Sequence, residues 1–240
     1  MPSAIVVGGG LSGLSAAHTM IQGGVKVTLF ERNAFLGGNS TKATSGMNGG
    51  GTRTQKAMGV DDSPDIFLED MLRSATGQKT GPRPASYPLA EVFANNAGKG
   101  VEWVQDEFGL ALDTVSYMGG HTKQRTHRTL AGGKFPGMEI TSALMKKYEK
   151  LADADDGTCD LFINSILTGL IQDEAGCVVG INYTDADGNA AEMRSDCVIL
   201  ACGGYGAGGA VAGSLLEIHR PDLMHLPTTN GDHSQGDGIK

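Results

Sequence analysis

Three glycines near the N-terminus have the spacing of a phosphate-binding turn. Gly8, Gly10 and Gly13 form a Gly-x-Gly-x-x-Gly motif directly after the apolar run at residues 4–7. In such a motif the first glycine permits a tight turn, the second lets backbone approach a pyrophosphate, and the third lets a helix pack closely on a strand. The helix N-terminus that follows offers N–H groups and partial positive charge to phosphate oxygens.

An acidic residue completes this pattern. Residues 26–31 have the composition of a second strand, and Glu31 ends it, where a carboxylate binds ribose hydroxyls. Between the two strands, apolar residues recur at helical spacing, so the first 31 residues predict a βαβ unit with a right-handed crossover. The acid at the strand end disfavours a 2′-phosphate, which makes NADP a poor candidate.

The glycine-rich stretch at residues 37–55, GGNSTKATSGMNGGGTRTQ, indicates which dinucleotide binds. Dense glycine marks either a flexible linker or close backbone approach to a ligand. Asn39, Ser40 and Thr44 are hydrogen-bonding residues rather than spacers, which favours a ligand. NAD does not require such a loop after the second strand, whereas the ribitol and isoalloxazine of FAD extend further. The stretch therefore predicts FAD.

The composition excludes several other classes. The chain has 240 residues, 40% of them hydrophobic, and a formal net charge of −8, which argues against a nucleic-acid or anionic-membrane surface. No apolar run reaches the length of a membrane span, and no targeting pattern precedes the first strand. We therefore expect a cytoplasmic protein, with mitochondria or another organelle left open. The four cysteines form no CxxC pair, so we expect buried, reduced thiols and no metal site.

The rest of the chain alternates between helical and strand patterns. Residues 63–77 predict a helix capped by Ser63, residues 88–109 a longer helix with Val92, Val101 and Val104 on its apolar face, and residues 137–153 a third. A β-rich region follows, in which residues 180–194 predict a hairpin that turns at Asp187–Gly188. These patterns predict an α/β fold with a parallel sheet, crossover helices and a small antiparallel layer.

Longer segments resemble a known family. The segments GGNSTKATSGMNGGGTRTQ, GGHTKQRTHR, GMEITSALMKK, VILACGGYG and PTTNGDHSQGDG resemble the flavocytochrome c and soluble, NADH-dependent fumarate reductase family of FAD-dependent oxidoreductases. The first segment is the most specific, and the resemblance extends over the whole chain. It implies that residues 1–240 are the N-terminal part of a Rossmann-like FAD-binding domain, incomplete at the C-terminus, with a capping and substrate domain expected after residue 240.

The resemblance also implies which positions contact FAD. Besides Gly8 and Gly10 of the glycine motif, they are Ser12 and Gly13 near the pyrophosphate, Glu31 at the adenosine ribose, Asn39, Ser40, Ser45 and Gly46 along the ribitol and flavin, Leu167 at the adenine, Ala201, Cys202, Gly203 and Gly204 closing over the cofactor, and Asp237 toward the ribityl or phosphate end. Distant membrane-bound relatives attach flavin through a histidine, and Asn39 aligns with that position. The resemblance therefore implies non-covalent FAD.

A second polar cluster lies at residues 119–129. His121, Arg125, His127 and Arg128 make it cationic in an otherwise acidic chain. One interpretation is a wall of the active site that attracts a dicarboxylate, because arginine binds carboxylates bidentately. The other is a solvated or structural loop, and both stay open at this point.

Catalysis itself is expected outside these residues. In the family, an arginine protonates the substrate, and it belongs to segments that follow the GDG motif at residues 236–238. The proton donor is thus expected beyond Lys240, and no residue here takes that role. The resemblance implies reduction of fumarate to succinate by hydride transfer from FADH2, with NADH or reduced flavin as electron donor.

Two alternatives to this activity stay open. One is a non-catalytic or vestigial FAD-binding module. The other is a sister oxidoreductase, such as a urocanate reductase, an aspartate oxidase or a ketosteroid dehydrogenase. If the chain is of the fumarate reductase type, we expect the isolated 240 residues to bind FAD weakly and to be inactive.

Overall fold

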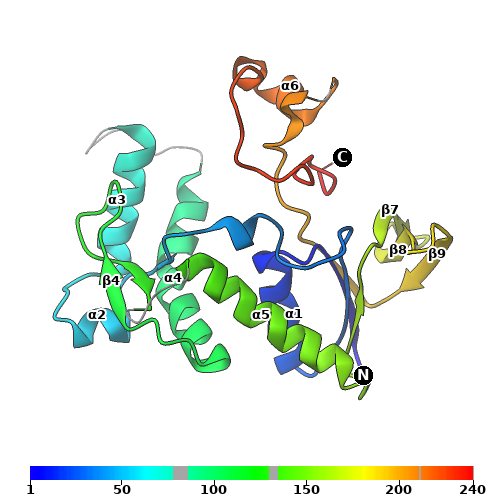
Figure 1. Cartoon of the computed structure of the whole chain (residues 1–240), viewed down its shortest axis with the longest axis horizontal. Helices are drawn as coiled ribbons and strands as arrows, with labels where there is room; N and C mark the ends of the chain where they lie inside the picture. Colours follow the sequence, from blue (N-terminus) through cyan, green and yellow to red (C-terminus); the bar gives the residue numbers. More distant parts are fainter. Residues whose placement is uncertain (78–85, 130–134, 211, 240) are drawn as a thin grey trace. The chain divides into compact units, whose positions relative to one another are not determined.

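The chain divides into two compact units. The structure, a computed structural model, describes residues 1–77, 86–129, 135–210 and 212–239. Unit 1 comprises Met1–Thr41 and Leu144–Lys240, and unit 2 comprises Lys42–Ala143. Figure 1 labels their elements along the chain.

Unit 1 is built on a parallel four-stranded sheet with the order β10-β1-β2-β6. Its strands are β1 (Ser3–Val7), β2 (Lys26–Phe30), β6 (Cys159–Phe162) and β10 (Cys197–Leu200). Helix α1 (Leu11–Gln22) joins β1 to the adjacent parallel strand β2, so the predicted βαβ unit is confirmed. The central strands are almost completely buried, because both faces of a parallel sheet are covered.

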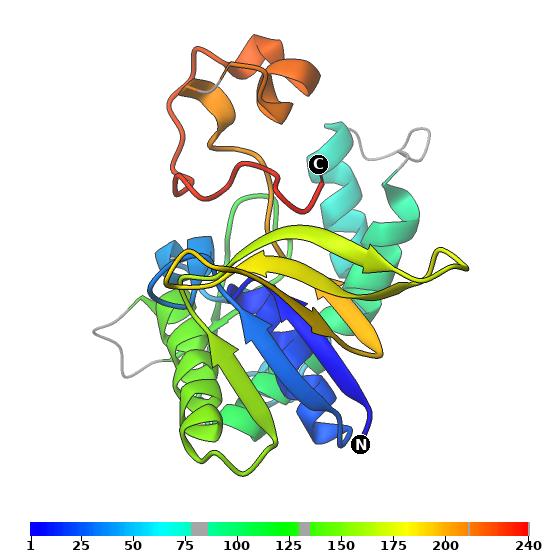
Figure 2. The same cartoon turned by 90° about the vertical axis from the view of Figure 1, so that its right-hand side faces the viewer.

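An antiparallel sheet covers one face of this parallel sheet. It contains β7 (Ile166–Gln172), β8 (Val178–Thr184) and β9 (Ala190–Arg194), and the turn between β8 and β9 has Gly188 at φ +87°, as the hairpin prediction requires. Ile181 and Tyr183 of β8 pack against Ile5 of β1 and Phe30 of β2 in one hydrophobic core. Figure 2 shows this layer crossing the parallel strands. The predicted fold class is thereby confirmed.

Helices cover the opposite face of the parallel sheet. Alternate residues of a strand point to opposite faces, so Ala4 and Val6 face α1 while Ile5 faces the antiparallel layer. Helix α5 (Pro136–Asp153) runs from unit 2 into unit 1, and the hydroxyl of its buried Tyr148 donates to the carbonyl of Asp160 at 3.0 Å. Both helices lie on one side of the sheet in Figures 1 and 2.

Unit 2 combines helices with a small antiparallel sheet of order β3-β5-β4. Its elements are β3 (Met47–Asn48), α2 (Arg53–Ala57), α3 (Pro64–Thr76), α4 (Tyr87–Phe108), β4 (Thr114–Ser116) and β5 (Thr126–Arg128). Three further short elements belong to unit 1: η2 (Gly208–Ala210), α6 (Leu215–His219) and η3 (Pro221–Leu223). The short helix η1 (Gly38–Lys42) lies where the chain passes from unit 1 to unit 2.

The long helices start where the sequence predicts, but the predicted apolar face of α4 is wrong at Val92. The hydroxyl of Ser63 accepts the N–H of Ile66 at 3.2 Å and caps α3. In α4 the buried face contains Val101 and Val104, whereas Val92 is 62% exposed. Because a helix has about 3.6 residues per turn, Val92 lies half a turn away from Val101 and faces outward.

The expectation of buried thiols is also wrong for part of the set. Cys159 is buried and Cys202 is half-buried, but Cys177 and Cys197 are exposed, and all four thiols are free. Cys177 ends a tight turn before β8, and Cys197 opens the edge strand β10, so neither position is covered on both sides. A β-rich context alone does not determine burial.

Candidate functional site

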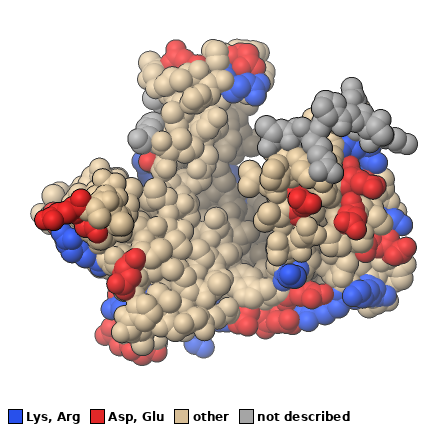
Figure 3. Space-filling view, turned by 180° about the vertical axis from the view of Figure 1, so that it is seen from behind, with Lys and Arg blue, Asp and Glu red and all other residues tan. Residues whose placement is uncertain are grey.

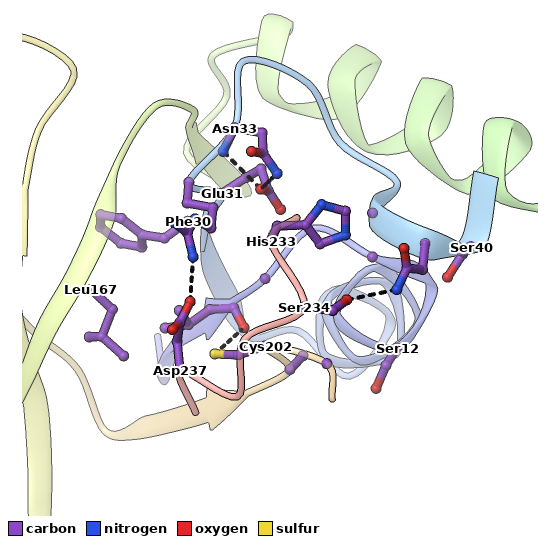
Figure 4. A pocket seen from close by; sticks show the side chains of 18 of the residues that line it. Ser12, Phe30, Glu31, Asn33, Ser40, Leu167, Cys202, His233, Ser234 and Asp237 are labelled. Atoms are coloured by element: carbon purple, nitrogen blue, oxygen red, sulfur yellow. Dashed lines mark hydrogen bonds and ion pairs between the residues drawn. The ribbon is translucent and has the colours of Figure 1, made fainter. Parts of the chain in front are cut away.

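A cavity of about 440 Å³ lies in unit 1 at the carboxyl ends of the parallel strands. This is the end of an open α/β sheet at which ligands bind, and the volume falls within the range of small-molecule sites. Most of the predicted cofactor residues line it: Gly8, Gly10, Ser12, Glu31, Asn39, Ser40, Leu167, Ala201, Cys202, Gly203 and Asp237. Figure 4 shows side chains from strands, helix and loops that line the cavity.

Two glycines of the motif, Gly8 and Gly10, line the cavity. Gly8 has φ +110°, and a Cβ there would lie 2.4 Å from the carbonyl oxygen of Ala201. A Cβ on Gly13 would lie 1.8 Å from the carbonyl oxygen of Gly8, so Gly13 permits close helix–strand packing rather than lining the cavity. Gly10 precedes α1 and gives it no side-chain cap. The first N–H groups of α1 have no intrahelical partner and suit an anion.

Glu31 presents an oriented carboxylate to the cavity. Its side chain accepts the N–H of Gly9 at 2.8 Å, and both the backbone N–H and the side-chain amide of Asn33 at 2.9 Å. The residue is only 6% exposed. These donors occupy both acceptor sites of Oε1 and one of Oε2, and they hold the carboxylate in place. The remaining acceptor site, on Oε2, suits the ribose contact predicted for this position.

Asn39 and Ser40 connect the glycine-rich loop to other walls of the cavity. The hydroxyl of Ser40 accepts the N–H of Leu11, at the start of α1, at 3.2 Å. The amide of Asn39 donates to Asn230 at 2.8 Å and to Ser234 at 2.7 Å, and its carbonyl oxygen accepts the N–H of Gly231. Asn39 thus holds the C-terminal segment at the cavity.

The wall predicted to meet adenine starts β7. Leu167 lies in the cavity lining beside Ser165, whose N–H donates to the carbonyl oxygen of Glu31 at 3.0 Å. This bond holds the apolar start of β7 beside the backbone of Glu31. An apolar wall beside a carboxylate suits an adenosine group, and the adenine contact of Leu167 stays a prediction.

The segment after β10 closes another side. The N–H of Ala201 donates to the carbonyl oxygen of Val7 at 2.8 Å, and Gly203 adopts φ +78°. Burial raises the pKa of the Cys202 thiol, which keeps it protonated at neutral pH. Asp237 forms an ion pair with Arg32, the residue after Glu31.

Ser45 and Gly46 belong to unit 2, and their contact with FAD stays a prediction. Gly46 has φ +132°, and a Cβ there would lie 2.2 Å from the carbonyl oxygen of His127. Glycine at this position is therefore required by the packing of β3 against β5, whatever else it contacts.

The structure buries part of the predicted substrate segment. Arg125 is fully buried, donates to both carboxylate oxygens of Asp62 at 3.1 and 3.0 Å, and pairs with Asp70 at 2.9 Å. Its guanidinium also lies 4.6 Å from the ring centroid of Phe67. The described contacts of Arg125 are thus those of a structural ion-pair cluster within unit 2, and substrate binding by this residue stays a prediction.

The other three residues of the segment differ in exposure. His127 is fully buried, lies 2.7 Å from the hydroxyl of Thr52, and has a pKa lowered by burial. His121 is half-buried, and burial together with the charge of Arg125 lowers its pKa. Arg128 is exposed, so it is the member of the set whose charge faces solvent.

Several cavity residues were not assigned a role from the sequence. They are Val7, Leu11, Phe30, Arg32, Asn33, Gly38, Ser165, Ile166, His233 and Ser234. Arg32 and Asn33 follow Glu31 directly, so the strand end itself was a signal for them. His233 lies within PTTNGDHSQGDG, a segment that carries the family resemblance, but nothing local indicates that it meets the loop at Asn39.

Figure 3 shows acidic and basic side chains interspersed over the described residues of the face in view. Within the described ranges, no helix is long and apolar enough to cross a membrane. The same residues contain no group of three His, Cys, Asp or Glu side chains that could hold a metal ion.

The hydrogen-bond donors that line the cavity suit an adenine dinucleotide. A Cβ on Gly10 would meet no atom nearer than the carbonyl oxygen of Gly37 at 3.9 Å, so the backbone of this cavity-lining residue is uncrowded and available to a pyrophosphate. Nε2 of His233 is buried without a partner within the described residues, as expected of a group that meets a ligand.

Comparison with known proteins identifies the family. The profile of the family described as FAD binding domain matches residues 3–240. The chain belongs to this family of FAD-binding domains. Fumarate reductase 1 of Saccharomyces cerevisiae is 35% identical to this FAD-binding chain, over 98% of the chain and 47% of that protein. The fumarate reductase of Schizosaccharomyces pombe is 34% identical, over 99% of the chain and 45% of that protein.

A solved structure of a fumarate reductase also resembles this chain. The open conformation of a flavocytochrome c3 fumarate reductase superposes with a TM-score of 0.85 and 29% identity, and the match covers 99% of the chain and 39% of that structure. The FAD-binding chain therefore represents the FAD-binding portion of the fumarate reductase and flavocytochrome c family, as the resemblance predicted. It spans about half the length of the curated relatives it matches.

Proposed function

We propose that this chain is the cofactor-binding part of an FAD-dependent reductase of the fumarate reductase type, with a small dicarboxylate such as fumarate as substrate and NADH or reduced flavin as electron donor. The observation that carries the proposal is the cavity of unit 1 in which the glycine turn, the start of α1 and Glu31 converge. When bound and reduced, FAD supplies a hydride to an activated double bond. The activity belongs to the whole protein, and the proton-donor arginine is expected after Lys240.

Different residues of unit 1 bind different parts of the cofactor. The N-terminus of α1 stabilises the negative charge of the diphosphate, Glu31 accepts hydrogen bonds from the ribose, and Leu167 contacts adenine. Ser40 and the backbone at Gly203 border the route toward the flavin. None of these groups moves a proton to substrate, so their role is to bind and orient.

The cofactor is proposed to bind non-covalently. An amide nitrogen is a poor nucleophile, so Asn39 cannot form the histidyl link of the distant membrane-bound relatives. Its amide already bonds Asn230, Gly231 and Ser234, which further supports a structural role for this side chain.

The test starts with the purified chain and its flavin. After acid precipitation, FAD should appear in the supernatant, with the absorbance of free flavin, whereas a yellow pellet would contradict non-covalent binding. The chain alone, anaerobically reduced, should show no reoxidation by fumarate. The full-length gene product should be reoxidised by fumarate and not by urocanate or a 3-ketosteroid. Turnover with one of those instead would assign a sister activity, and a full-length product that no acceptor reoxidises would indicate a non-catalytic module.

A further inference from the structure

The C-terminal segment at residues 227–238 forms a turn that borders the cavity. The N–H of Ser234 donates to the carbonyl oxygen of Gly231 at 2.9 Å, which places His233 at the corner of the turn. The turn is held by Asn39, which bonds Gly231 and Ser234. Ser234 is 3% exposed, so this connection is protected from water.

The ring of His233 packs directly against the backbone of Gly231. A Cβ on Gly231 would lie 2.3 Å from Cε1 of the ring, so the imidazole packs on bare backbone. In the view of Figure 4, the ring lies between Glu31 and Ser40 and belongs to the lining of the cavity. The turn thus directs the ring toward the site rather than toward solvent.

The unpaired nitrogen of His233 lies close to the glycine motif. Nε2 is buried and has no hydrogen-bond partner among the described residues. A Cβ on Gly38 would lie 3.8 Å from Nε2 and 3.7 Å from the Cα of Gly10, so both atoms border the same small space. Gly10 is the position at which backbone approaches a pyrophosphate.

The charges around the cavity favour an anion at this nitrogen. Among the described residues that line it, Arg32 and His233 are the side chains that can carry positive charge, while Glu31 and Asp237 are acidic. Arg32 is already engaged by Asp237. Among the basic side chains described in the lining, a diphosphate bound at the start of α1 therefore has His233 as the partner not already engaged by an acid.

We propose that His233 contacts the diphosphate of the bound cofactor, with its Nε2–H donating to a phosphate oxygen. This inference rests on the proposed function, since it assumes an adenine dinucleotide in the cavity. The bond gives the buried nitrogen the acceptor it lacks and adds a charge-assisted contact to those from α1.

The experiment compares ligands that differ in the diphosphate. Flavin-free protein is titrated calorimetrically with FAD, ADP and adenosine, using the wild type, His233→Ala, His233→Gln and the control His225→Ala, a histidine that is exposed and outside the cavity lining. For His233→Ala we expect about tenfold weaker binding of FAD and ADP, the scale of a hydrogen bond to a charged group. Adenosine binding should change less than about twofold, since adenosine lacks the contacted group.

The outcomes distinguish the proposed His233 contact from the proposed function on which it rests. Partial recovery by His233→Gln, which restores an N–H donor, together with unchanged binding by His225→Ala, supports the contact. Equal affinities of wild type and His233→Ala for ADP, or an equal loss for adenosine and ADP, would overturn it. Failure of the wild type to bind FAD at all would instead contradict the proposed function.

Discussion

At the scale of single residues, Glu31 shows how a buried carboxylate is held in place at the cavity. Its carboxylate receives three N–H groups from Gly9 and Asn33, and the residue is almost completely buried. A buried charge is tolerated only when it is well hydrogen-bonded. The carboxylate therefore organises the strand end before any cofactor arrives.

Glu31→Gln should weaken both the fold and FAD binding. The new amide group replaces an acceptor that faces the N–H of Gly9, so a donor meets a donor, and unfolding free energy should fall by about 1–3 kcal/mol. Urea denaturation with FAD titration measures both effects. Glu174→Gln, at an exposed turn, is the matched control and should change neither. A normal FAD affinity in Glu31→Gln would remove this residue from the binding site.

Asp70 in unit 2 makes stability depend on pH. Burial acts to raise its pKa, but hydrogen bonds from Thr122 and the charge of Arg125 lower it below the ordinary value of 3.8. Because the folded-state pKa is depressed, the ionised group adds stability above about pH 3.8, and this contribution disappears as pH falls through the lower folded-state value.

Asp70→Asn should therefore destabilise the protein at pH 7 by about 2 kcal/mol, through weaker bonds to Arg125 and Thr122. The difference in unfolding free energy between Asp70→Asn and the wild type should shrink as pH falls toward 3, which is ~one unit below the ordinary pKa of an aspartate. Urea unfolding across pH measures it, with the exposed neighbour Glu69→Gln as control. A difference that is independent of pH would show that packing rather than charge explains the loss.

At the scale of elements, the contact between β1 and α1 depends on an absent side chain. The Cβ position of Gly13 lies 1.8 Å from the carbonyl oxygen of Gly8, a backbone atom that cannot move aside cheaply. The helix can therefore approach the turn only because residue 13 is glycine. This approach aims the helix N-terminus at the cavity.

Gly13→Ala should push α1 away from the turn and abolish measurable FAD binding. The expected loss of unfolding free energy is about 1–3 kcal/mol, as for overpacked cores. Far-UV circular dichroism, thermal unfolding and FAD titration check it. Gln22→Ala, at the exposed end of the same helix, should keep both properties. Wild-type affinity in Gly13→Ala would mean that the start of α1 does not hold the diphosphate.

At the scale of the whole molecule, the predicted FAD contacts are distributed over both compact units. The cavity residues belong to unit 1, while Ser45 and Gly46 belong to unit 2. Ligand binding stabilises the segments that it contacts, and amide hydrogen exchange reports this locally.

FAD should therefore slow exchange at residues 8–13, 31–40, 201–203 and 231–237, and at residues 45–46 if their predicted contact is correct. Mass spectrometry of peptides with and without FAD makes the comparison, and β9, which does not line the cavity, serves as internal control. Protection in β9 but not at residues 8–13 would place the ligand elsewhere.

The sequence by itself determined the βαβ unit and the fold class, and its family resemblance supplied about half of the cavity lining. The signals for the unit and the fold are local: the spacing of Gly8, Gly10 and Gly13, the acid after β2, and the caps and turns that start α3 and join β8 to β9. Local spacing predicts local structure because neighbouring residues determine both the periodicity of apolar side chains along a helix or strand and the places where the chain turns.

Only the tertiary structure decided which polar groups meet. Arg125 looked available for a carboxylate, yet Asp62 and Asp70 bury its charge. His233 attracted no role, yet Asn39, 194 positions earlier (233 − 39), holds its turn against the cavity. Such partners are far apart along the chain and become neighbours only through packing, so no local pattern carries the information.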